Sequence, residues 1–202
     1  MNILQIFPTI VSYTKNFLNE TEINLLLKMI EDAKTENHQL LGGDAESSYD
    51  NYDILKDLKL KRPYLYDKIE NQLNNHVYAI GLPEQAITNS WFNVQQENSE
   101  LFVHNHPDSK ISSALYLRAD DDSSKLYFHD VHPHKQMEHY VKSTELNEVK
   151  YWVKPERGLM VCFPSWLKHS SDNEKNLTNN RTVISFNSLN KGCMDGQPRR
   201  KE

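Results

Sequence analysis

The second half of the chain is dominated by short runs in which apolar and polar residues alternate. From about residue 88 onward there are six such runs, separated by turn-forming residues: TNSWFNV, ISSALYL, SKLYFHD, VKYWV, GLMVCF and RTVISF. A period of two is the pattern of β-strands with one buried face, and many short strands of this kind are typical of antiparallel sheets. We therefore expect a double-sheet jelly roll over residues 88–190.

Residues 1–87 carry a helical pattern instead. A first apolar stripe follows Asn19, and Glu22 three residues later completes the sequence pattern of a capping box. A second stripe starts near Pro63 and stops at Gly81, because proline suits the first turn of a helix and glycine its end. The apolar positions are Ile23, Leu26, Leu27, Ile30 and Ala33 in the first stripe and Leu65, Ile69, Leu73, Val77 and Ile80 in the second. The polar connector between the stripes is predicted to be a loop, and the whole is predicted to be an α+β domain whose helices brace one outer face of the jelly roll.

Composition limits the class of protein. A chain of 202 residues, 38% of them hydrophobic, can bury one core, so we expect a single domain over 1–202 with a loose tail at 191–202. The formal net charge of −5 argues against a general affinity for nucleic acid or anionic membranes, because such affinity needs a basic excess. The sequence has neither a signal-peptide pattern nor a long apolar span, so we expect a soluble, cytoplasmic protein. Cys162 and Cys193 lie far apart and outside any CxxC pattern, which favours reduced thiols.

The segment HNHPD, residues 104–108, contains two overlapping pairs of metal-ligand residues. Side chains at i and i+2 of a strand point to the same face, so His104 with His106, or His106 with Asp108, could converge on one ion. His169 follows a glycine turn, an apolar strand and a proline-bearing turn, GLMVCFPSWLK, which would deliver it to the mouth of a barrel. With His169, the first pair gives a three-histidine site and the second gives the two-histidine, one-carboxylate site of non-haem Fe(II) oxygenases. Taken alone, HNHPD would equally suit a solvated polar turn.

Arg181 opens the last strand, twelve residues after His169. It shares one face of that strand with Val183, Ser185 and Asn187. A guanidinium on an inward face is costly unless an anion meets it, and a carboxylate is its best partner. The pattern therefore predicts a binding site for an acidic cosubstrate, with a surface ion pair at a strand end as the alternative.

Other polar side chains are predicted to face the same interior. Tyr116 shares a strand face with the small residues Ser112 and Ala114, which leaves room for a ligand that its phenol could bind, or for ordinary core packing. Residues of the preceding strand that could touch substrate or fill the barrel are Trp91, Asn93 and Gln95.

A histidine-rich stretch lies between two of the predicted strands. Its histidines are His129, His132, His134 and His139. Their spacing is not that of a regular zinc site, so we expect a mobile loop over the mouth of the site, which could act as a lid.

The succession NSWFNV, HNHPDSKISSALYL, KLYFHD, KPERGLMVCFPSWLKHSS and RTVISFN closely resembles a family of 2-oxoglutarate- and Fe(II)-dependent oxygenases of bacteria and tailed phages, within the prolyl-hydroxylase-like superfamily. The resemblance implies a double-stranded β-helix fold and a dioxygenase that uses O2, Fe(II) and 2-oxoglutarate. It implies that His106 and His169 bind iron together with His104 or Asp108, and that Arg181 and Tyr116 bind the cosubstrate. The HxHP pattern of the family favours His104, whereas the carboxylate argument favours Asp108.

Two further interpretations stay open. A cupin-like dioxygenase would use three histidines without 2-oxoglutarate, and a jelly-roll binding module would not be catalytic at all. The substrate and the oligomeric state are not indicated by the sequence.

Overall fold

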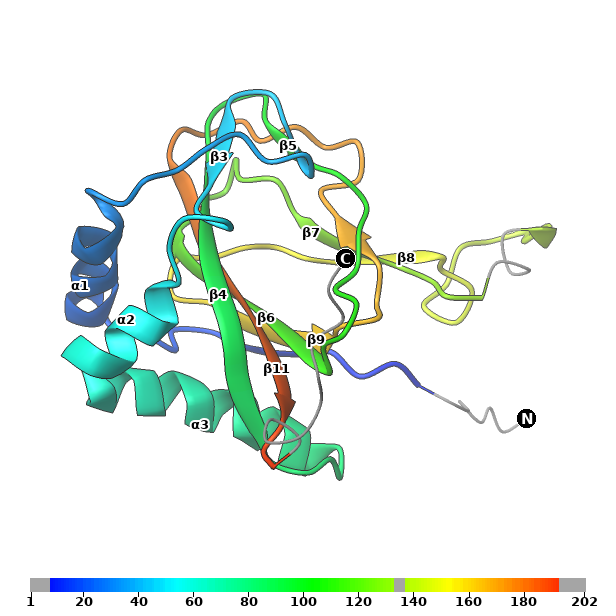
Figure 1. Ribbon diagram of the computed structural model, residues 1–202. Coiled ribbons are helices and arrows are strands. Elements are labelled where there is room, and N and C mark those ends of the chain that lie inside the picture. Colours follow the sequence, from blue (N-terminus) through cyan, green and yellow to red (C-terminus); the bar gives the residue numbers. More distant parts are fainter. Residues whose placement is uncertain (1–7, 133–136, 193–202) are drawn as a thin grey trace.

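The computed structural model describes residues 8–132 and 137–192 as an α+β fold in which all assigned strand pairs are antiparallel (Figure 1). The large sheet has the order β1 (Ser12–Thr14), β9 (Met160–Pro164), β6 (Ile111–Arg118), β11 (Arg181–Asn190), β4 (Gln85–Gln95) and β3 (Ala45–Ser47). The small sheet has the order β10 (His169–Ser170), β7 (Leu126–His129) and β8 (Lys150–Val153), and β2 (Leu41–Gly42) pairs with β5 (Glu100–Leu101). The six alternating runs of the sequence thus all contain strands, as predicted.

The central strand β11 has a different core on each of its faces. Ile184 and Phe186 point toward the helices, in a cluster that includes Leu55, Leu65 and Leu73. Val183, on the opposite face, belongs to a second cluster that lies between the two sheets. The other buried members of that cluster are Ala114, Tyr116, Leu126, Phe128, Leu159, Val161, Phe163 and Leu167. The alternation read from RTVISF therefore separates a helix-facing side from a sheet-facing side.

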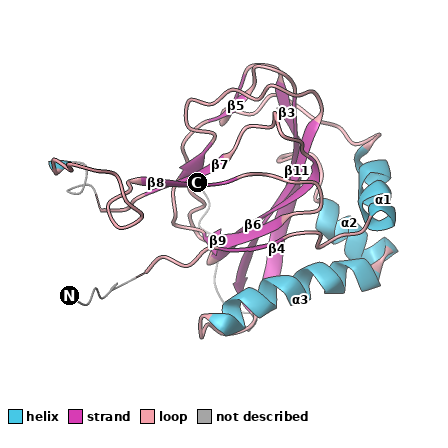
Figure 2. Cartoon of the chain, turned by 180° about the vertical axis from the view of Figure 1, so that it is seen from behind, coloured by secondary structure: helices cyan, strands magenta, loops and turns pink. Residues whose placement is uncertain are grey.

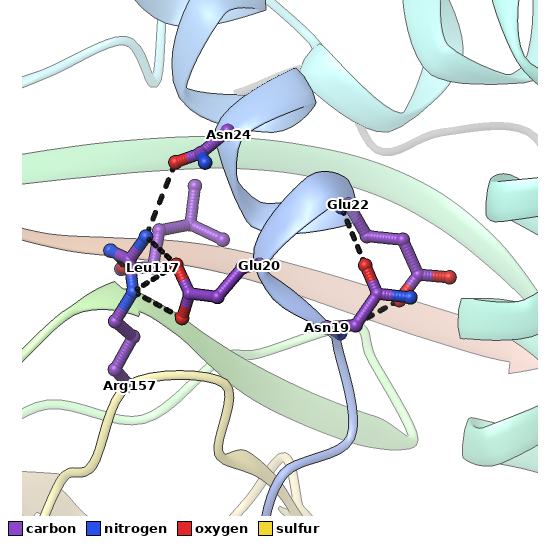
Figure 3. A network of polar contacts seen from close by, with 6 residues as sticks. All are labelled: Asn19, Glu20, Glu22, Asn24, Leu117 and Arg157. Atoms are coloured by element: carbon purple, nitrogen blue, oxygen red, sulfur yellow. Dashed lines mark hydrogen bonds and ion pairs between the residues drawn. The ribbon is translucent and has the colours of Figure 1, made fainter.

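Helix α1 (Glu20–Ile30) begins at the predicted capping box. The Asn19 side chain accepts a hydrogen bond from the Glu22 backbone N–H at 3.0 Å, and the Glu22 carboxylate accepts one from the Asn19 N–H at 2.9 Å (Figure 3). The same helix is tied to the large sheet by Arg157, which donates to the Glu20 carboxylate at 2.8 Å and to the Leu117 carbonyl at 2.6 Å. These contacts fix the start of α1 beside β6.

Helix α3 (Pro63–Ala79) is also where the sequence predicts it. Pro63 occupies the first turn, and Gly81 follows the helix with a φ of +75°, in the left-handed region that glycine adopts without strain. Figure 2 shows the helices together on one side of the large sheet.

The connector between the two predicted helices is not only a loop, and this part of the prediction was wrong. It contains β2, β3 and a helix, α2 (Ile54–Lys61), which is capped by the Asp53 side chain accepting from the Lys56 N–H at 3.1 Å. The apolar spacing of Ile54, Leu55 and Leu58, all fully buried, was the available signal for α2.

In residues 8–132 and 137–192, no helix combines the length and apolar composition required to cross a membrane. Burial raises the pKa of the Cys162 thiol to about 12, so this cysteine is a neutral core thiol. Cys193, His134 and most of the predicted tail lie outside the described residues.

Candidate metal centre

Three of the four predicted metal-ligand residues lie together at one end of the space between the sheets. His104 and His169 form an isolated antiparallel bridge, with the His169 N–H donating to the His104 carbonyl at 2.9 Å and the reverse bond at 3.1 Å. The His106 N–H donates to the Ser165 carbonyl at 2.9 Å. Backbone pairing between the 104–106 segment and the turn into β10 therefore brings together residues 63 positions apart.

The side-chain geometry of this cluster fits one metal ion. The Nε2 atoms of His106 and His169 are 3.2 Å apart, and one ligand atom from each of His104, His106 and His169 lies within 4.8 Å of the others. Adjacent ligand atoms about 2.1 Å from a metal stand about 3 Å from each other, so the 3.2 Å separation is close to an edge of a coordination polyhedron.

Two of these rings are fixed in the tautomer that a metal needs. The Nδ1 of His104 lies 2.8 Å from the Phe102 carbonyl, and the Nδ1 of His169 lies 3.0 Å from the Leu167 carbonyl. A carbonyl oxygen only accepts, so each Nδ1 carries the proton and each Nε2 keeps its lone pair for a ligand.

Burial also keeps the cluster neutral. Desolvation lowers the pKa of His104 and lowers that of His106 to about 4, where the neighbouring His104 adds to the effect. The pKa of His169 lies well below its ordinary value for the same two reasons, burial first and then the other histidines. Neutral imidazoles at physiological pH are able to bind a cation without first losing a proton.

Asp108 lies outside this cluster. It is exposed to solvent and has a φ of +60°, because the chain leaves the extended conformation after His106. The His106–Asp108 pair therefore does not have the strand geometry on which the prediction of a shared face relied, and Asp108 is not among the residues that line the cavity.

Arg181 lies in the same cavity as the histidines, and its burial is unusual for a cation. It is 5% exposed, and it donates to the Gln95 side-chain oxygen and, at 3.4 Å, to the Ser124 carbonyl. Its guanidinium lies 5.2 Å from the Tyr116 ring centre. No carboxylate forms an ion pair with it in the described parts of the chain, and burial lowers its pKa. The predicted alternative, a surface ion pair at a strand end, does not describe this arginine.

Several polar atoms around Arg181 also lack partners. The buried atoms here that have no hydrogen-bond partner among the described residues are Arg181 Nε, Gln95 Nε2, Asn93 Oδ1 and Ser124 Oγ. A buried polar group without a partner is costly, so this cluster indicates a polar ligand at the Arg181 end of the cavity.

The remaining sequence-predicted residues are distributed around this cavity. It is lined by Trp91, Asn93, Gln95, Leu101, His104, His106, Ser113, Ala114, Tyr116, Lys125, Leu126, Phe163, His169, Ser171, Arg181, Val183 and Ser185. The sequence did not predict the polar chain behind His106, in which Ser165 bonds Ser112 at 2.8 Å and Ser112 donates to Asn187 at 2.7 Å. Serine and asparagine on inward strand faces were the available signal.

The histidine-rich stretch does not form a second metal site in the part that the structure describes, where the metal-type cluster is that of His104, His106 and His169. The Nε2 of His129 bonds the Ser170 hydroxyl at 2.8 Å. Residues 137–149 of this segment extend away from the body of the protein (Figures 1 and 2), so these residues are not seen in the expected position over the mouth, and His134 lies outside the described residues.

Comparison with known proteins agrees with this site. Residues 89–187 match a family described as "Putative 2OG-Fe(II) oxygenase". This segment belongs to the 2OG-Fe(II) oxygenase family. The chain is accordingly an oxidoreductase whose cofactors are iron and 2-oxoglutarate. A search of curated proteins found no match.

Solved structures share the fold at low sequence identity. A 2OG-Fe(II) oxygenase family oxidoreductase from Burkholderia pseudomallei is 13% identical, with a TM-score of 0.63 over 94% of this chain and 88% of the other. HygX from Streptomyces hygroscopicus, with nickel and 2-oxoglutarate bound, is 11% identical, with a TM-score of 0.64 over 91% and 84%. A viral collagen prolyl hydroxylase from Paramecium bursaria Chlorella virus-1, in its 2OG complex, is 11% identical, with a TM-score of 0.54 over 90% and 96%. The fold of this chain is therefore that of 2OG oxygenases.

Proposed function

We propose that this chain is a 2-oxoglutarate- and Fe(II)-dependent dioxygenase that hydroxylates a substrate not yet identified and releases succinate and CO2. One observation carries the proposal: a buried arginine with no carboxylate partner lines the same cavity as three neutral histidines. A dicarboxylic keto acid would fit both ends of the cavity, because one carboxylate would pair with the guanidinium while the keto-acid group binds the metal. The family membership of residues 89–187 supports the same assignment.

In this proposal the metal ligands are His106, His169 and His104, rather than Asp108. The backbone bridge to His169 and the Nδ1 bond to Phe102 hold His104 in the cluster, whereas Asp108 is exposed outside it. Three neutral ligands leave the charge of Fe(II) to be balanced by the dianionic cosubstrate, and Arg181 gives the loaded cavity one further positive charge.

Arg181, Tyr116 and Ser185 are proposed to bind 2-oxoglutarate. Burial raises the pKa of Tyr116 despite the opposing effect of Arg181, so its phenol stays protonated and able to donate. Gln95 orients the guanidinium from the opposite strand position, since Arg181 and Gln95 are register partners. The donors left unsatisfied at this end would then be satisfied by carboxylate oxygens.

When bound, iron would supply the oxidative chemistry that couples decarboxylation of the keto acid by O2 to hydroxylation. The chain's own part is to hold, orient and exclude water: two imidazoles present Nε2, Arg181 anchors the keto acid, and Phe163 and Leu126 line the cavity with apolar surface. We further propose that the two sheets form a double-stranded β-helix. The cytoplasmic location stays an expectation.

The test is succinate formation from 2-oxoglutarate with Fe(II) under air, together with the metal content of the purified protein. His169→Ala and His104→Ala are expected to lose bound metal, and Asp108→Asn, the matched control, is expected to keep it. Metal retention in His104→Ala with loss in Asp108→Asn would overturn the ligand set. A metal-free wild-type protein that binds neither iron nor 2-oxoglutarate would overturn the function and favour a non-catalytic module.

A three-histidine dioxygenase that does not use 2-oxoglutarate is the second candidate, since the cluster consists of histidines alone. Arg181→Met separates the two. If 2-oxoglutarate is the cosubstrate, this variant should lose the stabilisation that 2-oxoglutarate gives the metal-loaded protein in thermal unfolding without oxygen, while its metal content is kept. Equal stabilisation of wild type and variant would favour the second candidate.

A further inference from the structure

The outer edge of the small sheet is unpaired. Strand β8 is the last in the order β10, β7, β8, and its residues pair with β7 on one side only. The Asp130 N–H donates to the Val149 carbonyl at 2.9 Å, whereas the His129 N–H turns the other way, to the Lys168 carbonyl. Since backbone groups alternate along an antiparallel pair, Tyr151 bonds toward β7.

The alternate residues, Lys150 and Trp152, therefore direct their backbone N–H and C=O groups toward the free edge. None of these backbone groups forms a hydrogen bond within residues 8–132 and 137–192. Proteins usually protect such an edge with proline, a bulge or a covering segment. Here the described protection is one charged side chain, Lys150, which is paired with Asp172 at 2.7 Å.

Large apolar side chains are exposed along the same hairpin. Tyr151 and Trp152 are 64% and 49% exposed, although they lie in a strand. The other exposed apolar residues between β7 and β8 are Val131, Met137, Tyr140, Val141 and Leu146. The hairpin projects from the body in both views (Figures 1 and 2), and the described residues of the chain leave these side chains exposed. Exposed apolar surface of this kind marks an interaction site.

We propose that β8 pairs antiparallel with β8 of a second copy of this chain, about a two-fold axis through Tyr151. The two small sheets would then form one continuous six-stranded sheet. A four-residue strand alone buries too little for a stable interface, which needs about 1,000 Å² in total, and the exposed apolar side chains of the hairpin supply the additional surface.

The register follows from hydrogen-bond direction and charge. Two residues that face each other in an antiparallel pair either both direct their backbone groups toward the partner strand or both direct them away. A two-fold axis between two residues would pair one residue of each kind, so the axis must pass through a residue. An axis through Tyr151 places Lys150 opposite Trp152 of the other copy, and both have free backbone groups. It also places Glu148 opposite Lys154 of the other copy, and Val149 opposite Val153, and all of these pairs are favourable.

The two adjacent registers bring like charges together. An axis through Trp152 would set Lys150 opposite Lys154 of the other copy, and an axis through Lys150 would set the two Lys150 residues against each other. Like charges directly opposite destabilise a strand pair. The Glu148 carboxylate accepts a hydrogen bond from the Ser143 hydroxyl, and Lys154 is ion-paired with the exposed Asp121. Dimer formation would exchange these two exposed contacts for the Glu148–Lys154 pair.

The test is the mass of the full chain in solution across a concentration series, by sedimentation equilibrium. The wild type should reach twice the chain mass of 23.7 kDa. Trp152→Pro should be monomeric, because it removes an outward N–H that makes no bond within the protomer, and Trp152→Phe, which keeps that N–H, should stay dimeric.

A charge-reversal set keeps the test decisive if the proline variant fails to fold. Glu148→Lys should weaken dimerisation about tenfold, Glu148→Lys with Lys154→Glu should restore it, and Glu145→Lys, an equal charge change on the same hairpin, should leave it unchanged.

A wild type that stays monomeric at every concentration overturns the proposal and leaves the edge for an extended peptide. A dimer that survives both Trp152→Pro and Glu148→Lys overturns it equally. Neither result would affect the succinate assay, so the proposed function is tested separately.

Discussion

The ring of His106 is held by side chains, whereas the rings of His104 and His169 are held by backbone carbonyls. Trp91 stacks on it with ring centres 5.5 Å apart and planes 23° apart, and a side-chain hydrogen bond with Asn187 raises its pKa against the larger effect of burial. Asn187 is in turn held by the Ser112 hydroxyl at 2.7 Å. The orientation of this candidate ligand therefore depends on a buried polar chain.

Asn187→Ala should lower metal affinity about 10–100-fold, because a ligand whose orienting partner is lost presents its lone pair less well. Oxygen-free titration with Mn(II), followed by calorimetry, measures this. Asn190→Ala is the matched control, since it removes the same side chain from the same strand at a position bonded to Gln85 instead. Wild-type affinity in Asn187→Ala would show that the chain does not position His106.

The sequence HNHPD contains two possible ligand pairs, and its pattern alone did not indicate which pair lies in the cluster. The rule that i and i+2 share a face holds only while the chain is extended. His104 satisfies it through the bridge to His169, and Asp108, at positive φ after Pro107, does not. Whether a strand ends after His106 is decided by the turn that follows, and a periodicity argument does not detect that.

At the scale of elements, the periodicity of the sequence predicted those helices and strands that packing in the folded protein also stabilises. The strands β6, β9 and β11 and the helices α1 and α3 bury apolar residues as predicted, for example Leu73 and Val77 on α3, whereas β8 stays exposed. The helix α2 was missed because its eight residues follow a polar stretch and its short apolar spacing has no second repeat. The stacking of Trp91 on His106 also could not be predicted, since it depends on how β4 and the 104–106 segment meet in space.

The capping box of α1 gives a prediction for element stability. Asn19→Ala should lower the free energy of unfolding by about 1 kcal/mol, because the Glu22 N–H loses its acceptor at the start of the helix. Urea unfolding measures the loss. Asn19→Asp keeps an acceptor at this position and should remain within a few tenths of a kcal/mol of wild type. Equal losses in the two variants would mean that the cap contributes nothing specific.

At the scale of the whole molecule, burial is the first cause of a lowered pKa at histidines in separate parts of the fold. They are His76, His104, His106, His129 and His169. In the unfolded chain each would bind a proton near its ordinary value of 6.5, while in the folded protein each stays neutral to lower pH. The unfolded state thus binds more protons below pH 6.5, and the free energy of unfolding must fall as the pH falls through this range.

His76 allows this linkage to be tested away from the candidate metal centre. Its Nδ1 lies 2.8 Å from the Ser12 hydroxyl, where α3 meets β1, and its buried Nε2 has no hydrogen-bond partner in residues 8–132 and 137–192. In metal-free protein, urea unfolding should show that the free energy of unfolding decreases from pH 6.5 to about pH 4, which is the pKa of His106. His76→Gln should make that decrease shallower, because one proton fewer is taken up on unfolding. Adding saturating metal should steepen it, since protons then compete with the ion at the other histidines. A stability that is constant or rises as the pH falls through this window would contradict the neutral, buried state of these rings.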